Sequence, residues 1–260
     1  MANLVVSIIQ SHLFWESIDQ NLQAFETKIN DILEATDVVV LPEMFTTGFT
    51  MNPANYAENH EGKGLQWMKK MAQQKNCAVV GSLSVKENNH FFNRLYWVFP
   101  NQTVEFYDKR HLFSMGNEPK YYNAGNKKLI IEYKGWRICP LVCYDLRFPV
   151  WSRNTKQQPY DVLIYVANWP AVRSYPWKQL LIARAIENQC FVLGVNRVGD
   201  DGNAVSHSGD SMAMNARGEI LTKIKPNEET IETVVFQKNE LTDFRISFPV
   251  LNDGDDFTIT

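Results

Sequence analysis

Residues 4–43 read LVVSIIQSHLFWESIDQNLQAFETKINDILEATDVVVLPE, and the fold class follows from this segment. It contains two continuous apolar runs of strand length, LVVSII at residues 4–9 and VVVL at residues 38–41, which are typical of strands buried on both faces. Ser17–Gln20 resembles a helix capping box, and apolar residues at helical spacing follow it: Leu22, Phe25, Ile29, Ile32 and Leu33. The segment therefore predicts a β-α-β unit and an α/β fold.

The rest of the chain continues with helices and strands. Helices are expected at residues 65–74 and from Pro176, which suits a first helical turn, to Ile186, and a helix or an irregular segment is expected near 148–154. Apolar or alternating runs predict strands at residues 78–85, 91–99, 103–107, 162–167, 191–195 and 230–236. No linker or composition break interrupts the chain, so residues 1–260 are expected to form one domain.

Two hairpins are also expected. The first pairs residues 129–133 with 136–143 across Lys134-Gly135, and the second pairs 211–215 with 219–222. A polar tail is expected after residue 236. Pattern alone does not choose between one large mixed sheet and two stacked sheets.

Composition argues against several classes of partner and site. The formal charge is −3 with basic residues scattered, which favours neither nucleic acid nor an anionic membrane as partner. We find no secretory signal and no apolar stretch long enough to span a membrane, and therefore expect a cytoplasmic protein with reduced cysteines. The spacing of the cysteines and histidines fits no zinc site, so no metal is expected.

Three predicted strands end in residues that can do chemistry. Glu43, Lys109 and Cys143 each follow a strand, and strand ends in α/β proteins often carry reactive groups. The thiol of Cys143 would need a base to become an effective nucleophile, and Glu43 could be that base. Lys109 could stabilise the oxyanion that forms when the thiol attacks a carbonyl group. Each residue also has an ordinary interpretation: a buried apolar cysteine, a solvated carboxylate and an exposed lysine.

Four motifs decide between these interpretations. The segments are LPE at 41–43, YDKRHLF at 107–113, LVCYDLRFP at 141–149 and ARAIEN at 183–188. Together and in this order they resemble the nitrilase superfamily, also called the carbon-nitrogen hydrolases. The resemblance implies a four-layer αββα sandwich that dimerises, without a cofactor.

The resemblance also implies roles for individual residues. Cys143 would be the nucleophile of a thioester mechanism, and Glu43 the general acid and base. Lys109 and the backbone N–H of Tyr144 would form the oxyanion hole. Glu118, in MGNEP at residues 115–119, is the candidate for a second active-site glutamate that orients Lys109.

Two further segments, YDLRFPVWSRN at 144–154 and NWP at 168–170, resemble the omega-amidase branch. This implies hydrolysis of 2-oxoglutaramate or 2-oxosuccinamate to the 2-oxo diacid and ammonia, as in methionine salvage. The short substrate carries a carboxylate, which needs a cation, and Arg173 is the candidate. Other residues expected to line the pocket are Asn168, Trp169, Phe49 and Phe113, whereas Arg147, Arg184 and His111 are expected to be structural.

Three alternatives stay open. The chain could be another amidase of the superfamily, a carbamoylase or a nitrilase, acting on a different small substrate. A papain-like or glutaminase-type enzyme would require a histidine base. A non-catalytic interaction protein on the same scaffold is the alternative from another class, although it would have little reason to retain the thiol, the ammonium and the carboxylate together.

Overall fold

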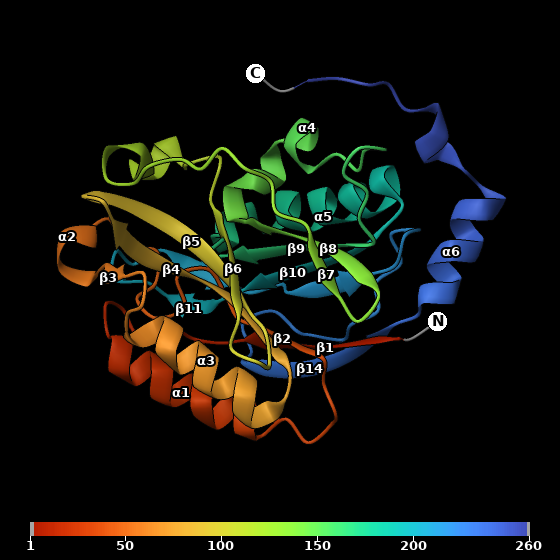
Figure 1. Ribbon diagram of the computed structural model, residues 1–260. Coiled ribbons are helices and arrows are strands. Elements are labelled where there is room, and N and C mark those ends of the chain that lie inside the picture. The colour runs from red at the N-terminus through yellow and green to blue at the C-terminus, as the bar shows by residue number, and fades with distance from the viewer. Residues whose placement is uncertain (1–2, 259–260) are drawn as a thin grey trace.

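Two β-sheets lie face to face in the computed structural model, which describes residues 3–258 (Figure 1). The first sheet has the order β14 (Thr230–Phe236), β1 (Leu4–Gln10), β2 (Val38–Val40), β4 (Ala78–Glu87), β5 (His90–Val98) and β6 (Val104–Asp108), with β3 (Glu58–Asn59) also paired to β4. The second has the order β13 (Met212–Met214), β10 (Phe191–Asn196), β9 (Val162–Ala167), β8 (Trp136–Val142) and β7 (Ile131–Tyr133).

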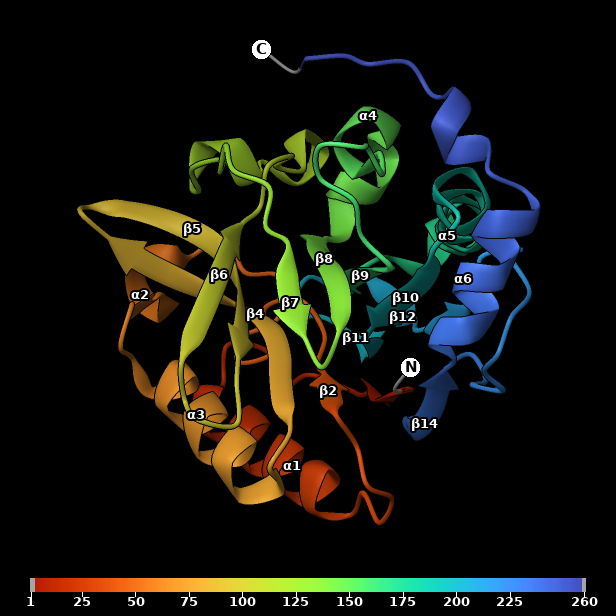
Figure 2. The ribbon, with the colours of Figure 1, turned by 45° about the vertical axis from the view of Figure 1, so that its right-hand side comes forward.

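Helices cover the outer faces of the two sheets. α1 (Ile18–Asn30) and α3 (Lys63–Lys75) pack on the first sheet, and α5 (Ser174–Asn188) packs on the second, with α6 (Lys238–Ser247) beside it (Figure 2). The arrangement is the predicted four-layer αββα sandwich. The remaining short elements are α2 (Pro53–Tyr56), α4 (Pro149–Ser152), the β11 (Val198–Asp200) and β12 (Ser206–Ser208) hairpin, and five 3-10 turns at Ser114–Gly116, Glu118–Lys120, Cys143–Arg147, Ala171–Arg173 and Val250–Asp253.

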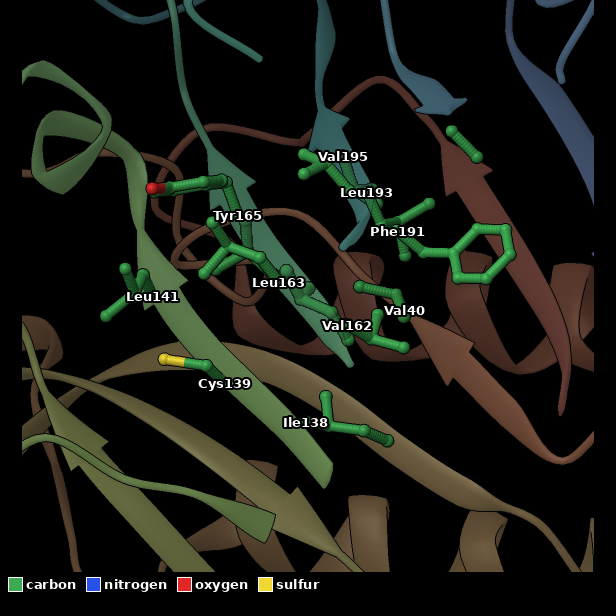
Figure 3. Close-up of a cluster of buried hydrophobic side chains, with 14 of the residues drawn as sticks. Val40, Ile138, Cys139, Leu141, Val162, Leu163, Tyr165, Phe191, Leu193 and Val195 are labelled. Carbon is green, nitrogen blue, oxygen red and sulfur yellow. The ribbon is translucent and has the colours of Figure 1, made fainter. Parts of the chain in front are cut away.

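The central strands β1, β2 and β4 of the first sheet are buried on both faces, which explains their apolar sequences. In β2, Val38 and Val40 belong to the core between the sheets, whereas Val39 belongs with Leu41 to the core under α1 and α3. Side chains alternate across a strand, so each apolar run supplies two cores at once. Figure 3 shows Val40 of β2 close to side chains from β8, β9 and β10 of the second sheet.

α5 approaches the second sheet closely at a glycine. A Cβ atom on Gly194 of β10 would lie 2.5 Å from Leu181 Cδ1 and 2.8 Å from Trp177 Cζ2. The helix therefore packs directly onto the strand backbone, and a side chain at position 194 would push it away.

Most predicted elements are confirmed, including the first hairpin, where Lys134 and Gly135 both have positive φ (48° and 78°) between β7 and β8. The predicted start of α1 is only partly right, because Ser17 occupies the N-cap position but makes no side-chain capping hydrogen bond. The helix also ends at Asn30, which leaves Leu33 93% exposed in the following turn.

Two predictions near the C-terminus are only partly right. The expected polar tail contains α6, in which Leu241 is the one buried residue of ten, so its helical periodicity is weak. α6 is held instead by polar contacts, since Arg245 donates to the carboxylate of Asp161 and to the carbonyl of Tyr160. The second expected hairpin is present in shortened form. Met214 and Ile220 form an antiparallel bridge, and the N–H groups of Asn215 and Leu221 donate to the carbonyls of Glu219 at 3.0 Å and Ala213 at 2.8 Å. No helix within residues 3–258 is long and apolar enough to cross a membrane.

Candidate active site

Strand ends from both sheets meet at one edge of the sandwich. β2 and β6 run in the same direction in the first sheet, and β8 and β9 are parallel in the second. Glu43 follows β2, Lys109 follows β6, Cys143 follows β8 and Asn168 follows β9. Because parallel strands bring their carboxyl ends to the same edge, the topology gathers residues that lie up to 125 positions apart in the chain.

A buried ammonium group lies between two carboxylates. Lys109 Nζ donates to Glu43 Oε1 at 2.9 Å, and to Glu118 Oε2 at 2.9 Å and Oε1 at 3.1 Å. All three side chains have 0% exposure. Glu43 accepts two further hydrogen bonds, from Asn93 Nδ2 at 2.8 Å and from the backbone N–H of Asn168 at 2.7 Å. Such charge-assisted bonds hold the cluster in one geometry.

The charges in this cluster depend on each other. Burial alone would lower the pKa of Lys109, but the carboxylates of Glu118 and Glu43 outweigh it, so the pKa is raised and the ammonium form is favoured. Burial also raises the pKa of Glu118, which Lys109 opposes. The single ammonium group of Lys109 therefore offsets only part of the negative charge of Glu43 and Glu118, and both carboxylates stay hydrogen-bonded to it.

Cys143 occupies a strained turn directly after β8. Its φ angle is +44°, a left-handed conformation that a residue other than glycine rarely adopts, and such strain often accompanies a functional site. Asp145, fully buried, stabilises the turn by accepting from the Val142 N–H at 3.0 Å and the Tyr107 hydroxyl at 2.8 Å. Its other oxygen accepts from the His111 N–H at 3.0 Å, which ties the turn to the segment that carries Lys109.

Burial and the neighbouring Glu43 favour the protonated form of the Cys143 thiol. Burial raises its pKa well above the ordinary value, the negative charge of Glu43 raises it further, and Lys109 lowers it only in part. Burial and the carboxylate of Glu43 together outweigh the lowering effect of Lys109 on this pKa. A base must take the proton as the sulfur reacts, and Glu43 is the neighbouring group able to do so.

A cavity of about 520 Å³ opens onto Cys143 and Lys109. The cavity wall contains Tyr144 and five residues that the sequence placed near the substrate: Phe49, Phe113, Asn168, Trp169 and Arg173. Aromatic rings form much of the wall, with Phe113 and Tyr144 edge to face at 5.1 Å between centroids. Glu43 and Glu118 are not among the lining residues but are fully buried beside Lys109, which lines the cavity.

Three other predicted roles can be compared with the structure. Arg184 donates to the carbonyl of Leu146 at 2.7 Å and so supports the Cys143 turn, as expected for a structural residue. His111 stacks on Phe148 with 3.8 Å between ring centroids, as expected for packing. Arg147, by contrast, lines the cavity, because the 3-10 turn after Cys143 directs it there.

Sequence reasoning missed Asn93, which donates to both Glu43 and Glu118. The signal was present: Asn93, Leu95 and Trp97 alternate along β5, so a polar residue shares a face with buried apolar ones. It also missed Asp145, which the Cys143 motif contains, and the β11–β12 hairpin, which contributes Asp201 and His207 to the cavity. Among the described residues, no group of three His, Cys, Asp or Glu side chains is arranged to hold a metal ion.

Comparisons with known proteins agree with this geometry. The family model of the carbon-nitrogen hydrolases matches residues 5–246. The omega-amidase YafV of Escherichia coli K12 is 45% identical over 259 residues, which cover 100% of both chains. The 2-oxoglutaramate amidase of Bacillus subtilis is 34% identical over 251 residues, covering 95% of this chain and 96% of that protein.

A solved structure shows the same likeness. The crystal structure of XC1258 from Xanthomonas campestris, a CN-hydrolase superfamily protein with an arsenic adduct in its active site, superposes with a TM-score of 0.97. The two proteins share 40% sequence identity, and the match covers 100% of both chains.

Proposed function

The chain belongs to the carbon-nitrogen hydrolase family, and from this premise we propose that it is an omega-amidase. It is a cysteine-dependent amidohydrolase that cleaves the terminal carboxamide of a small 2-oxo acid amide, such as 2-oxoglutaramate or 2-oxosuccinamate. Water is consumed, and the products are the 2-oxo dicarboxylate and ammonia. The names of the two amidases that resemble the chain support this substrate class.

In the first half of the proposed reaction, Glu43 removes the thiol proton as Cys143 Sγ attacks the amide carbon. The carbonyl oxygen becomes an oxyanion, which Lys109 Nζ and the backbone N–H of Tyr144 stabilise. The C–N bond then breaks, Glu43 returns its proton to the leaving nitrogen, and ammonia departs. A thioester on Cys143 remains.

In the second half, Glu43 takes a proton from water, and the resulting nucleophile attacks the thioester carbon. The C–S bond breaks, the acid product leaves, and Cys143 regains its proton from Glu43. Glu118 stays bound to Lys109 throughout and holds its ammonium group toward the oxyanion. No cofactor takes part in the proposed reaction.

One observation carries the proposal: the buried Glu43–Lys109–Glu118 cluster borders a cavity whose wall contains Cys143 in a strained turn. Burying three charged groups is costly, and apolar residues in place of the two carboxylates and the ammonium group would stabilise the fold at least as well. A cluster of this kind is expected where chemistry requires it. The cavity also contains Arg173, a cation suited to the substrate carboxylate.

The test compares two cysteines of the same region. We expect Cys143→Ala to abolish ammonia release from 2-oxoglutaramate, since no other group in the cavity replaces the sulfur. Cys139→Ala changes a cysteine buried in β8 four residues earlier and should retain turnover. Activity that persists in Cys143→Ala would refute the proposed nucleophile.

A substrate panel then separates related activities. We expect release of ammonia from 2-oxoglutaramate and succinamate to be much faster than from glutamine, a carbamoyl amine or an alkyl nitrile. A preference for the nitrile or the carbamoyl amine would instead identify one of the other activities of the superfamily.

The setting of the enzyme is also a proposal. We propose that residues 1–260 act as one domain in the cytoplasm, and that the reaction serves the removal of the amide left by glutamine-dependent transamination, as in methionine salvage. A homodimer is proposed as well, supported by apolar side chains exposed near α5, namely Val172 (83%), Tyr175 (73%) and Ile186 (52%). A monomer mass in sedimentation equilibrium would refute the dimer.

A further inference from the structure

Two guanidinium groups line the cavity without an ion pair to any acid within residues 3–258: Arg147 and Arg173. Four other arginines do form ion pairs with carboxylates, namely Arg94, Arg137, Arg184 and Arg245. An unpaired guanidinium on a cavity wall is available to an anionic ligand.

Aromatic rings of the same wall fix the position of each group. Arg147 Cζ lies 5.0 Å from the centroid of Trp169, and Arg173 Cζ lies 5.4 Å from the centroid of Phe113. A guanidinium that lies against an aromatic ring keeps its N–H groups free for hydrogen bonds while its orientation is restricted. The two arginines are therefore prepared for an anion before it arrives.

The charged groups of the cavity lie in two places, at its floor and on its wall. At the floor, Lys109 is paired with Glu43 and Glu118, so its ammonium group is not available to the carboxylate of the substrate. Among the described lining residues, Asp201 is the only acid, and one of its oxygens already accepts the backbone N–H groups of Asn203 and Val205. The two arginines thus make the wall positive.

We propose that Arg147 acts with Arg173 to bind the distal carboxylate of the substrate, and that Arg147 makes the site select 2-oxo acid amides against 2-amino acid amides. The proposal rests on the proposed omega-amidase function and deepens it. A carboxylate flanked by a carbonyl group presents only acceptors to the two guanidinium groups. An ammonium group in place of that carbonyl would lie close to two positive charges and be repelled.

The test measures kcat and KM for Arg147→Gln with three amides of the same chain length. With 2-oxoglutaramate, kcat/KM should fall about 10- to 100-fold, mainly through KM, as expected for the loss of a hydrogen-bonded charge. With pentanamide, which has no charge, kcat/KM should stay within about two-fold. With glutamine the loss should be smaller than with 2-oxoglutaramate, so the ratio of the two kcat/KM values falls.

Two further variants and a second readout complete the design. Arg147→Lys keeps the charge but loses the planar fork, so it should recover only part of the loss. Arg217→Gln is the matched control, because Arg217 also lies over an aromatic ring, Phe244 at 4.3 Å, but outside the cavity, and it should change nothing. Inhibition by the product 2-oxoglutarate should weaken about 10- to 100-fold in Arg147→Gln, and the rate of Cys143 alkylation by iodoacetamide should not change.

The outcomes separate this inference from the proposed function. If the wild type hydrolyses 2-oxoglutaramate well and Arg147→Gln does so equally well, the inference is wrong and the omega-amidase proposal stands. An equal loss with 2-oxoglutaramate and pentanamide also overturns it, because Arg147 would then support the Cys143 turn rather than the carboxylate. If the wild type shows no preference for carboxylate-bearing amides, the proposed function itself fails.

Discussion

Asp108 and Lys109 are neighbours in the chain, yet they belong to two different charged clusters on opposite faces of the first sheet. The inner cluster, between the sheets, consists of Lys109, Glu43, Glu118 and Asn93. The outer cluster, on the other face, consists of Arg94, Asp108 and Glu87. Each contains one cation and two carboxylates, so the two clusters have the same charge composition.

They differ in access to water and in what surrounds them. The carboxylates of the inner cluster are fully buried, whereas the side chains of Asp108 and Glu87 are 15% and 38% exposed. Arg94 lies against the ring of Phe106 at 4.0 Å, while the inner cluster lies beside a thiol and a cavity. The comparison teaches that an ion-pair composition does not identify a catalytic group; complete burial beside a nucleophile does.

Replacing the two cations tests this distinction with the largest expected effect. Lys109→Met should lower kcat for 2-oxoglutaramate by about 10²- to 10³-fold, because an oxyanion donor is lost. Arg94→Met should leave kcat within a few-fold but lower the free energy of unfolding by about 1–3 kcal/mol, measured in urea, because the hydrogen bonds from the buried Arg94 guanidinium to Asp108 and Glu87 are lost. An equal loss of kcat in both variants would show that the inner and outer clusters do not differ in their role in catalysis.

Replacing one acid in each cluster should give a smaller difference. Glu118→Gln should lower kcat about 10- to 100-fold, since a neutral amide holds the Lys109 ammonium less firmly than a carboxylate with bonds of 2.9 and 3.1 Å. Glu87→Gln should change neither kcat nor stability appreciably, because the Glu87 side chain is 38% exposed and water screens its ion pair with Arg94 to about 0–1 kcal/mol. Full activity of Glu118→Gln would show that Glu118 is structural.

The pH dependence of thiol alkylation should give the smallest but most specific difference. Burial first and Glu43 second raise the pKa of Cys143, so the thiolate forms only at high pH and the alkylation rate rises late in the titration. Glu43→Gln removes the negative charge, lowers this pKa and should shift the rate profile to lower pH. Asp108→Asn should not shift it. A shift to higher pH in Glu43→Gln would contradict the assignment of charge to Glu43.

Some of this site was predictable from sequence and some was not, for physical reasons. Glu43 and Cys143 lie in short motifs after continuous apolar strands, which are easily found because they are buried on both faces. Lys109 lies in a motif after β6, which is partly exposed. Asn93 required knowledge of which face of β5 points inward, which depends on pairing with β4 and β6.

Arg147 and α6 escaped prediction for other reasons. The direction of Arg147 depends on the φ angle of +44° at Cys143, and no pattern of residue types specifies that angle. α6 buries only Leu241 and is held by long-range polar contacts, so its local sequence lacks an apolar stripe. In both cases the deciding interactions are tertiary rather than local.

The alternation that separates Asp108 from Lys109 also restricts how this part of the gene can change in length. Inserting one residue within β6 would shift the end of the strand by half a repeat, presenting the carboxylate of Asp108 to Glu43 and Glu118 and sending the ammonium group of Lys109 to the opposite surface. Loss of two residues would preserve the orientation. Insertions and deletions in this strand should therefore be tolerated only when they change its length by an even number of residues. The turn at Pro100–Gln102 lies outside the strands and does not have this restriction.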